Sequence, residues 1–205
     1  MLLKIFQFMD INKVRSAAVY AASSTKIKQV YFDAARLLGK VLAENGIRLI
    51  YGAGHMGLMG EVATSVLENG GTATGVIPEF MIEKGWHKTD LTQLIVTKDM
   101  HERKATIERL SDILIALPGG IGTFDELFEI LTWKQLGLHT KPIIILNIDG
   151  YYNEWLACVR KMVDEHFLLP VHENLFSVID DPKQLVSAIV NAPAWDASFS
   201  KHAKI

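Results

Sequence analysis

The stretch Pro118-Gly119-Gly120-Ile121-Gly122-Thr123-Phe124-Asp125-Glu126 organises this chain. It follows a short aliphatic run at residues 113–117, which is typical of a buried parallel strand, and it leads into a helical pattern. Glycines at such a junction let backbone N–H groups approach a phosphate closely, and the helix N-terminus behind them adds unpaired donors and about half a positive charge. The stretch therefore predicts a phosphate-binding loop, made by Gly119, Gly120, Gly122 and Thr123.

Glu126 falls in the first turn of the predicted helix, beside the expected ligand. With Thr123 it matches a capping box, in which each of the two side chains accepts a free backbone N–H at the helix start. A cap does not require nearby glycines, however, and glycine in ordered backbone costs about 0.5–1 kcal/mol relative to alanine. The three glycines therefore favour a ligand over a cap alone.

A second glycine loop, Gly52-Ala53-Gly54-His55-Met56-Gly57, matches the dinucleotide-binding pattern GxGxxG between a predicted strand and a helix. That pattern usually follows the first strand, and an acidic residue about 20 positions later binds a ribose. Here the loop follows the second strand, and the nearest acidic residue after the next strand, Glu79, comes late. An NAD site is thus the weaker alternative, and we expect Gly52 and Gly54 to face the same small ligand as the first loop.

Arg103 lies near the start of a helix predicted from residue 99, where a cation opposes the helix dipole by about 0.3–1 kcal/mol. It shares an i, i+4, i+7 face with Ile107 and Leu110, which turns its guanidinium toward the core. An arginine placed there needs an anionic partner, either a protein carboxylate or a ligand. We favour a site that Arg103 shares with Glu126, whereas Lys104 lies off this face.

Strand and helix patterns alternate along the chain, which predicts a single-domain α/β fold with a doubly wound, mainly parallel, Rossmann-like sheet. Both glycine loops and the helix of Arg103 follow strands, so all three can meet at the carboxyl edge of that sheet. Residues 22–25 follow the first strand, and their hydroxyls are expected to cap the next helix or to contact a phosphate, with capping favoured. Residues 79–90 show no clear period and predict a loop or flap. The strands are expected near residues 17–21, 48–51, 73–77, 93–96, 113–117 and 141–147.

The 205 residues fit one domain at 17–192, with an amphipathic N-terminal extension at 1–16 and a loosely ordered C-terminal tail at 193–205. A formal net charge of −2 gives no electrostatic reason to expect a nucleic acid or an anionic membrane as partner. No run approaches the roughly 18 apolar residues of a membrane span. The expected partner is therefore a small molecule.

Cys158 is the single cysteine, which excludes an intramolecular disulfide and a cysteine zinc cluster. We therefore expect a reducing, cytoplasmic location and place Cys158 in the core of a helical pattern. His55 has no second His, Cys or carboxylate at metal-ligand spacing, so no metal site is predicted.

The pairing of Met100-His101-Glu102-Arg103-Lys104 with residues 118–126 resembles the LOG (Lonely Guy) family of cytokinin riboside 5′-monophosphate phosphoribohydrolases. The likeness runs from about residue 17 to residue 191, and it includes YGAG at 51–54, GLMG at 57–60, GVIP at 75–78, TWKQLG at 132–137 and NIDGYY at 147–152. Such proteins have often been labelled lysine decarboxylases. The resemblance implies a homodimer that hydrolyses the N-glycosidic bond of AMP or an N6-substituted AMP, without cofactor or metal, to free base and ribose 5-phosphate.

The resemblance also implies individual roles. It places the catalytic pair on Arg103 and Glu126 and the phosphate loop on residues 119–123. Ser23 or Ser24 would add a phosphate contact, Met100 would lie beside the base, and Lys104 is a further substrate-binding candidate. This chain has Ala22 where the family usually has glycine, and residues 25–28 lack the usual Gly and Pro.

Three alternatives stay open at this stage. A nucleotide or molybdenum-cofactor carrier of similar fold would keep the loops without hydrolysing anything, and the joint presence of Arg103 and Glu126 argues against it. An NAD(P)-dependent oxidoreductase would need the loop at Gly52 as its main site. A pyridoxal-dependent decarboxylase would need a lysine that forms a Schiff base.

Overall fold

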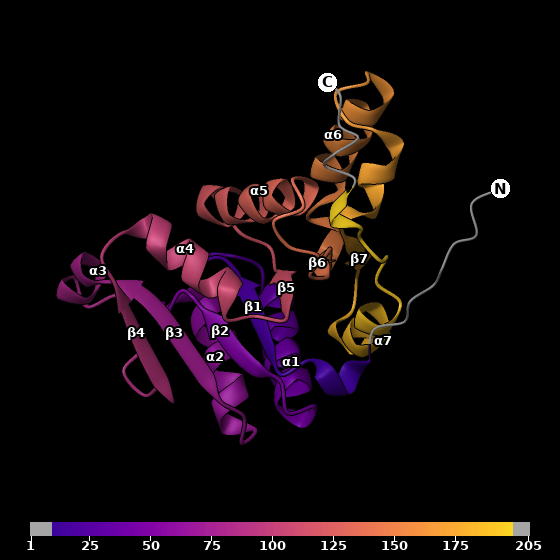
Figure 1. The fold of residues 1–205 in the computed structure, drawn as a ribbon. Helices are drawn as coiled ribbons and strands as arrows, with labels where there is room; N and C mark the ends of the chain where they lie inside the picture. The colour runs from indigo at the N-terminus through magenta and orange to yellow at the C-terminus, as the bar shows by residue number, and fades with distance from the viewer. Residues whose placement is uncertain (1–9, 199–205) are drawn as a thin grey trace.

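The computed structural model describes residues 10–198. Seven strands form one sheet in the order β4-β3-β2-β1-β5-β6-β7, and every pairing is parallel (Figure 1). The predicted doubly wound parallel sheet is confirmed. The strands are β1 (Ser16–Tyr20), β2 (Arg48–Tyr51), β3 (Ala73–Pro78), β4 (Gln93–Thr97), β5 (Ile113–Ala116), β6 (Ile143–Leu146) and β7 (Ser177–Ile179).

Helices connect these strands and cover both faces of the sheet (Figure 1). The α-helices are α1 (Gln29–Glu44), α2 (Gly57–Glu68), α3 (Glu79–Glu83), α4 (Met100–Arg109), α5 (Ile121–Gln135), α6 (Asn153–Asp164) and α7 (Leu185–Val190). Four short 3-10 turns complete the described chain: η1 (Ile11–Lys13), η2 (Ile148–Gly150), η3 (Pro170–Leu175) and η4 (Pro182–Gln184).

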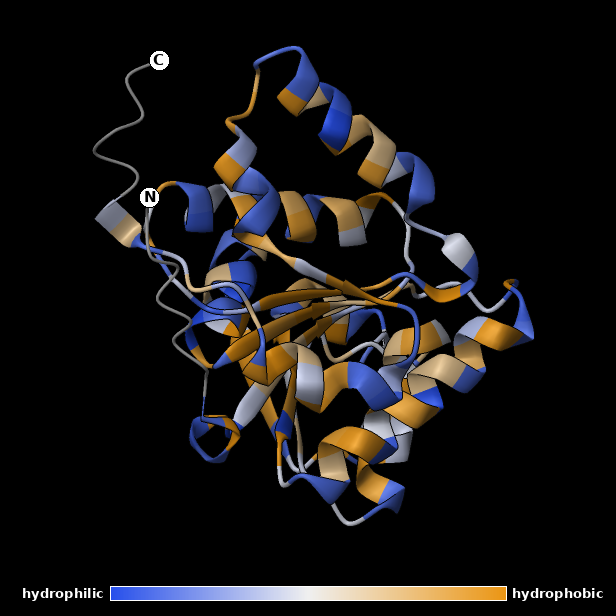
Figure 2. Ribbon diagram, turned by 90° about the vertical axis from the view of Figure 1, so that its right-hand side faces the viewer, coloured by the Kyte–Doolittle hydropathy of each residue, from blue (hydrophilic) through white to orange (hydrophobic). Residues whose placement is uncertain are grey.

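Alternation along each strand divides the core into two layers. On one face, Val19 and Ile115 pack with α1, α2 and α7, and on the other, Ala18 and Leu114 pack with α4 and α5. Figure 2 shows hydrophobic colour along the central strands and mixed colours on the surrounding helices. Because both faces are covered, the strands are aliphatic throughout, as a buried parallel sheet requires.

The order of the strands creates a switch point between β1 and β5. Strands β2, β3 and β4 are added one after another on one side of β1, as far as the edge of the sheet. The next strand, β5, pairs with the other side of β1. In an open parallel sheet, a crevice forms at the carboxyl ends of the strands where this reversal occurs. The β5–α5 connection, which carries the first glycine loop, starts at that place.

Lys134 is the one charged residue on the buried face of α5, which also carries Leu127, Ile130 and Leu131. It is only 1% exposed. Its Nζ donates to the carbonyl oxygen of Leu175 at 2.8 Å, and burial lowers its pKa to about 8. The lysine thus ties the end of α5 to η3.

Three local expectations were wrong. The hydroxyls of residues 22–25 do not cap α1, because the helix starts later, with Lys28 as an N-cap that has no side-chain bond. Part of the expected loop at 79–90 is the short helix α3. Cys158 is exposed rather than buried, because α6 turns the adjacent position, Val159, toward the core.

The C-terminal segment, which the structure describes as far as residue 198, also differs from its expectation. Trp195 is only 6% exposed and its ring lies 6.0 Å from that of His172, so this part of the expected loose tail packs on the domain. Of the expected terminal segments, residues 1–9 and 199–205 lie outside the described part of the chain.

Candidate functional site

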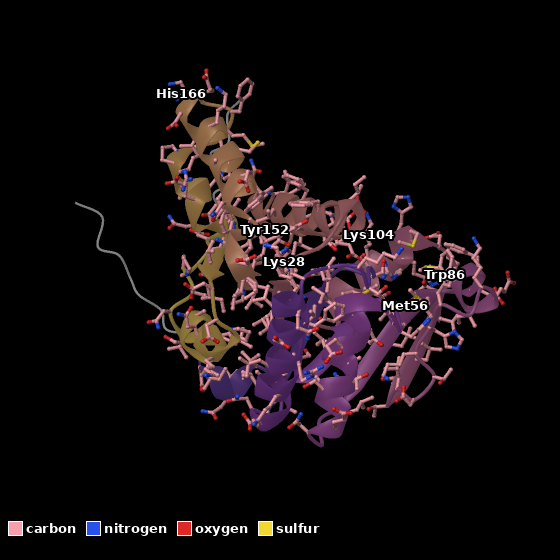
Figure 3. The ribbon with its side chains drawn as sticks, turned by 180° about the vertical axis from the view of Figure 1, so that it is seen from behind. Lys28, Met56, Trp86, Lys104, Tyr152 and His166 are labelled. Carbon is pink, nitrogen blue, oxygen red and sulfur yellow. The ribbon has the colours of Figure 1, made fainter. Side chains whose placement is uncertain are left out.

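Two adjacent cavities lie at the carboxyl edge of the sheet, and both are lined by Ser23, Met59 and Arg103. The glycine-loop cavity has a volume of about 300 Å³, and its other lining residues include Met100, residues 120–123, Asp125 and Glu126. The methionine cavity has a volume of about 370 Å³, and its other lining residues are Gly52, Gly54, His55, Met56, Met81 and Trp86. Figure 3 labels Met56 and Trp86, which lie near each other at this edge. The structure thus brings both predicted glycine loops to one place.

Helix α5 begins at Ile121, with Gly120 as its N-cap and no side-chain cap. The capping box that would join Thr123 to Glu126 is therefore wrong. Thr123 lies inside the first turn and Glu126 lies in the next one, so neither side chain stands where it could close the helix start. The helix N-terminus is left open toward the glycine-loop cavity.

The backbone of the loop is arranged so that its donors stay free. Within residues 10–198, no hydrogen-bond partner is found for the N–H groups of residues 119–123. The carbonyl groups of residues 117–120 all accept hydrogen bonds from the protein. Their donors, in chain order, are the Tyr152 hydroxyl (2.7 Å), the Ala22 N–H (3.2 Å), the Tyr151 hydroxyl (2.5 Å) and the Phe124 N–H (3.1 Å).

The glycines of this loop serve two different purposes. A Cβ at Gly120 or Gly122 would meet no other atom within 4 Å, so these positions present bare backbone to open space. A Cβ at Gly119 would collide with the side chain of Thr123. Gly119 thus allows the loop to close on its own helix, and the other two let an anion reach the N–H groups.

Arg103 and Glu126 form an ion pair, which is the favoured of the two kinds of anionic partner considered for Arg103. Arg103 Nη1 lies 3.0 Å from Glu126 Oε1, and the two side chains are only 7% and 12% exposed. Arg103 Nε also donates to the Val76 carbonyl at 3.2 Å, and Nη2 donates to the Gly52 carbonyl at 3.4 Å. Helix α4 therefore presents a guanidinium that is held by β3, by the second glycine loop and by α5.

A guanidinium has more donors than these three bonds use. Because Arg103 also lines both cavities, its remaining N–H groups can reach a ligand in either one. Glycine at position 52 leaves room for the Arg103 guanidinium, since a Cβ there would collide with Arg103 Nη2. The glycine expected to face the ligand thus also gives room to the arginine.

Burial shapes the charge of the site. It raises the pKa of Glu126 above the ordinary glutamate value, and the nearby Arg103 offsets this only in part. Burial, followed by the charge of Glu126, raises the pKa of Tyr20 well above its usual value, so this tyrosine stays neutral at the end of β1. Glu126 is therefore a carboxylate in a poorly solvated place, next to a fixed cation.

The other predicted site residues are divided between the cavities and their surroundings. Ser23 lines both cavities, and Met100 lines the glycine-loop cavity. Ser24 lines neither cavity, and its Oγ accepts from the N–H of Lys26 at 3.3 Å. Lys104 also lines neither, and its Nζ lies 3.1 Å from carboxylate oxygens of both Asp125 and Glu129 on α5.

Sequence reasoning missed the wall of the methionine cavity and the tyrosines behind the glycine loop. Met56 and Met59 lie at the start of α2, whereas Met81 and Trp86 lie on α3 and just after it, and no periodic pattern relates these two segments. Tyr151 and Tyr152 appeared only as part of a motif. The available sequence signal for the cavity was that residues 79–90, which include Trp86, show no clear period.

Two further findings apply to the described residues. No group of three or more His, Cys, Asp or Glu in residues 10–198 could hold a metal ion. None of the described helices is long and apolar enough to span a membrane.

The chain is similar to known proteins along most of its length. A family model described as "Possible lysine decarboxylase" matches residues 59–189. The cytokinin riboside 5′-monophosphate phosphoribohydrolase LOG5 of Arabidopsis thaliana is 42% identical over 183 residues, which are 88% of this chain and 80% of that protein. Its relative LOG7, also from Arabidopsis thaliana, is 39% identical over 191 residues, which are 93% and 88% of the two chains.

Among solved structures, the molybdenum cofactor carrier protein of Chlamydomonas reinhardtii has a TM-score of 0.64 at 22% identity, and the match covers 86% of this chain and 96% of that one. The molybdenum cofactor binding protein of Rippkaea orientalis has a TM-score of 0.66 at 21% identity, with the same coverage. At this identity the likeness concerns the fold.

The close approach of Arg103 to Gly52 leads to a stability prediction. Gly52→Ala should displace the guanidinium and leave the buried Glu126 without its partner, which should lower the free energy of unfolding by about 3 kcal/mol. Urea unfolding at neutral pH measures this. Gly122→Ala is the matched control, because its new Cβ meets open space and should change stability by less than about 1 kcal/mol. Equal stabilities of the two variants would show that Arg103 keeps its contacts.

Proposed function

The chain belongs to the family described as possible lysine decarboxylases, whose matched relatives are named phosphoribohydrolases, and we propose from this premise that it is a nucleoside 5′-monophosphate phosphoribohydrolase. It would hydrolyse the N-glycosidic bond of AMP or an N6-substituted AMP, which gives free base and ribose 5-phosphate. One observation carries the proposal: residues 120–123, whose N–H groups have no partner within residues 10–198, line the same cavity as the Arg103–Glu126 pair.

The phosphate would bind to the glycine loop. Its backbone N–H groups and the positive end of the α5 dipole attract an anion, and Gly120 and Gly122 leave the approach open. Ser23, which lines the same cavity from the β1 side, is placed to add a hydroxyl contact. Phosphate binding would then fix the attached ribose against α4 and α5.

Cleavage of the ribosyl C–N bond builds positive, oxocarbenium-like charge on the sugar. The Glu126 carboxylate would stabilise that charge electrostatically, and it would orient a ribose hydroxyl or the attacking water. A poorly solvated carboxylate acts more strongly in this role than one in water, because little solvent screens it. Arg103 would hold Glu126 ionised and in place.

The base would occupy the methionine cavity, which adjoins the glycine-loop cavity at Met59 and Arg103. Trp86 and the methionines Met56, Met59 and Met81 offer an apolar, adaptable wall for a purine ring. Its volume of about 370 Å³ also leaves space for an apolar group on N6. This supports N6-substituted AMP as part of the substrate class.

We also propose that the protein is a homodimer. Helix α5 and the residues after it expose apolar side chains, with Phe128 43%, Leu136 56% and Leu138 69% exposed. Such a patch is typical of an interaction surface. Light scattering at micromolar concentration should give twice the chain mass, and a fully active monomer would contradict this prediction.

The phosphate requirement tests the proposed function. AMP should be hydrolysed far faster than adenosine, because adenosine leaves the glycine loop empty and loses the binding energy that positions the sugar. Chromatography of the released base, with and without EDTA, measures both rates, and chelation should change neither. Equal rates on the two substrates would show that the loop is not a productive phosphate site. Release of base only after addition of inorganic phosphate would identify a phosphorylase instead.

Glu126→Gln tests the catalytic carboxylate. It keeps the shape of the side chain and an oxygen that can accept the Arg103 hydrogen bond but removes the charge, so turnover of AMP should fall by about 10²–10⁴-fold. In the wild type, kcat/KM should fall as the pH is lowered through the raised pKa of Glu126, because the neutral carboxyl cannot stabilise the sugar cation. The residual activity of the variant should lack this acid limb. A variant with a wild-type rate would assign Glu126 a structural role.

A further inference from the structure

Two adjacent tyrosines, which the proposed reaction does not use, donate hydrogen bonds to backbone carbonyls at the glycine loop. They lie between η2 and α6, more than 30 residues after the loop. The Tyr151 hydroxyl donates to the Gly119 carbonyl at 2.5 Å, and the Tyr152 hydroxyl donates to the Leu117 carbonyl at 2.7 Å. Both hydroxyls bind carbonyl oxygens, so neither contact uses an N–H group of residues 119–123.

Peptide geometry makes the Tyr151 contact consequential. In a planar trans peptide, the carbonyl oxygen of one residue and the N–H of the next point in opposite directions. A bond that holds the Gly119 carbonyl therefore also decides where the Gly120 N–H points. Without that bond, the linkage joins two glycines, which have the greatest conformational freedom of any residues. A flipped peptide would turn a carbonyl oxygen toward the bound anion.

Tyr151 is itself held in position. Asp149 and Gly150 have φ values of 53° and 70°, and this left-handed turn is tied to the start of α1 by an ion pair of 2.6 Å between Lys28 and Asp149. The Tyr151 ring packs edge-on against Tyr31 at 5.9 Å and against Tyr152 at 5.1 Å. Its hydroxyl therefore meets the loop from a fixed direction.

We propose that Tyr151 is a positioning residue: by holding the Gly119 carbonyl, it keeps the Gly120 N–H aimed at the phosphate of the substrate. The inference rests on the proposed function, since it assigns that N–H to phosphate binding. This role differs from that of a residue that only supports the fold. A contact that sets a phosphate donor should affect ligands that carry a phosphate and leave other ligands unaffected.

The variant Tyr151→Phe removes the hydroxyl and keeps the ring. Calorimetry with ribose 5-phosphate and with adenosine separates the two halves of the site, and steady-state kinetics with AMP follows the reaction. We expect affinity for ribose 5-phosphate to fall about tenfold, in the range for one misdirected hydrogen bond to a charged group. KM for AMP should rise similarly with a smaller change in kcat, and adenosine affinity should stay within twofold.

Tyr31→Phe is the matched control, because it removes a hydroxyl from the same ring cluster. That hydroxyl makes no hydrogen bond to the loop or elsewhere in residues 10–198, so the control should bind both ligands as the wild type does. Thermal unfolding of both variants checks that each is folded.

The outcomes distinguish this inference from the proposed function. If the wild type binds ribose 5-phosphate but releases no base from AMP, and Tyr151→Phe weakens that binding selectively, the proposed function fails and the positioning role stands. If Tyr151→Phe binds ribose 5-phosphate like the wild type, or weakens both ligands equally, the positioning role is overturned whatever the enzyme hydrolyses. Absence of any ribose 5-phosphate binding by the wild type also overturns it.

Discussion

The site depends on the direction of a few peptide groups between β5 and α5. The carbonyls of residues 117–120 all accept hydrogen bonds from the protein, and in the described part of the chain no partner is found for the N–H groups of residues 119–123. This arrangement needs β1 and β5 to be neighbours, because the loop after β1 supplies the Ala22 N–H to the Pro118 carbonyl. The switch point of the sheet thus creates both the crevice and the anion-binding backbone within it.

A second constraint joins the remaining parts of the site. Arg103 is buried on α4, and it is accommodated because Glu126, Val76 and Gly52 all accept hydrogen bonds from it. A buried ion pair of this kind adds little to stability by comparison with a well-packed apolar core, since both charges lose their hydration. Its presence at the junction of the two cavities is therefore better explained by the proposed function, in which a fixed carboxylate would face the sugar.

Much of this could be predicted from sequence, because it follows from local rules. The alternation of strands and helices gives the sheet, and a cation at the unfavourable end of a helix points to a carboxylate partner for Arg103. The errors concern features that tertiary packing decides. Cys158 is exposed because of the angle at which α6 packs, Trp195 is buried because the C-terminal segment returns to His172, and the methionine cavity joins segments that no period relates. The tyrosines behind the loop lie far from it in the chain.

The central claim is that one substrate spans the two cavities, with its phosphate on the backbone of residues 119–123 and its glycosidic carbon beside residue 126. A crystal structure of the Glu126→Gln variant with AMP tests this most directly. The account predicts phosphate oxygens within hydrogen-bond distance of these N–H groups, the ribose next to residues 103 and 126, and the adenine against Trp86 and the methionines. A phosphate bound away from the glycine loop, or an adenine placed in that loop, would contradict it.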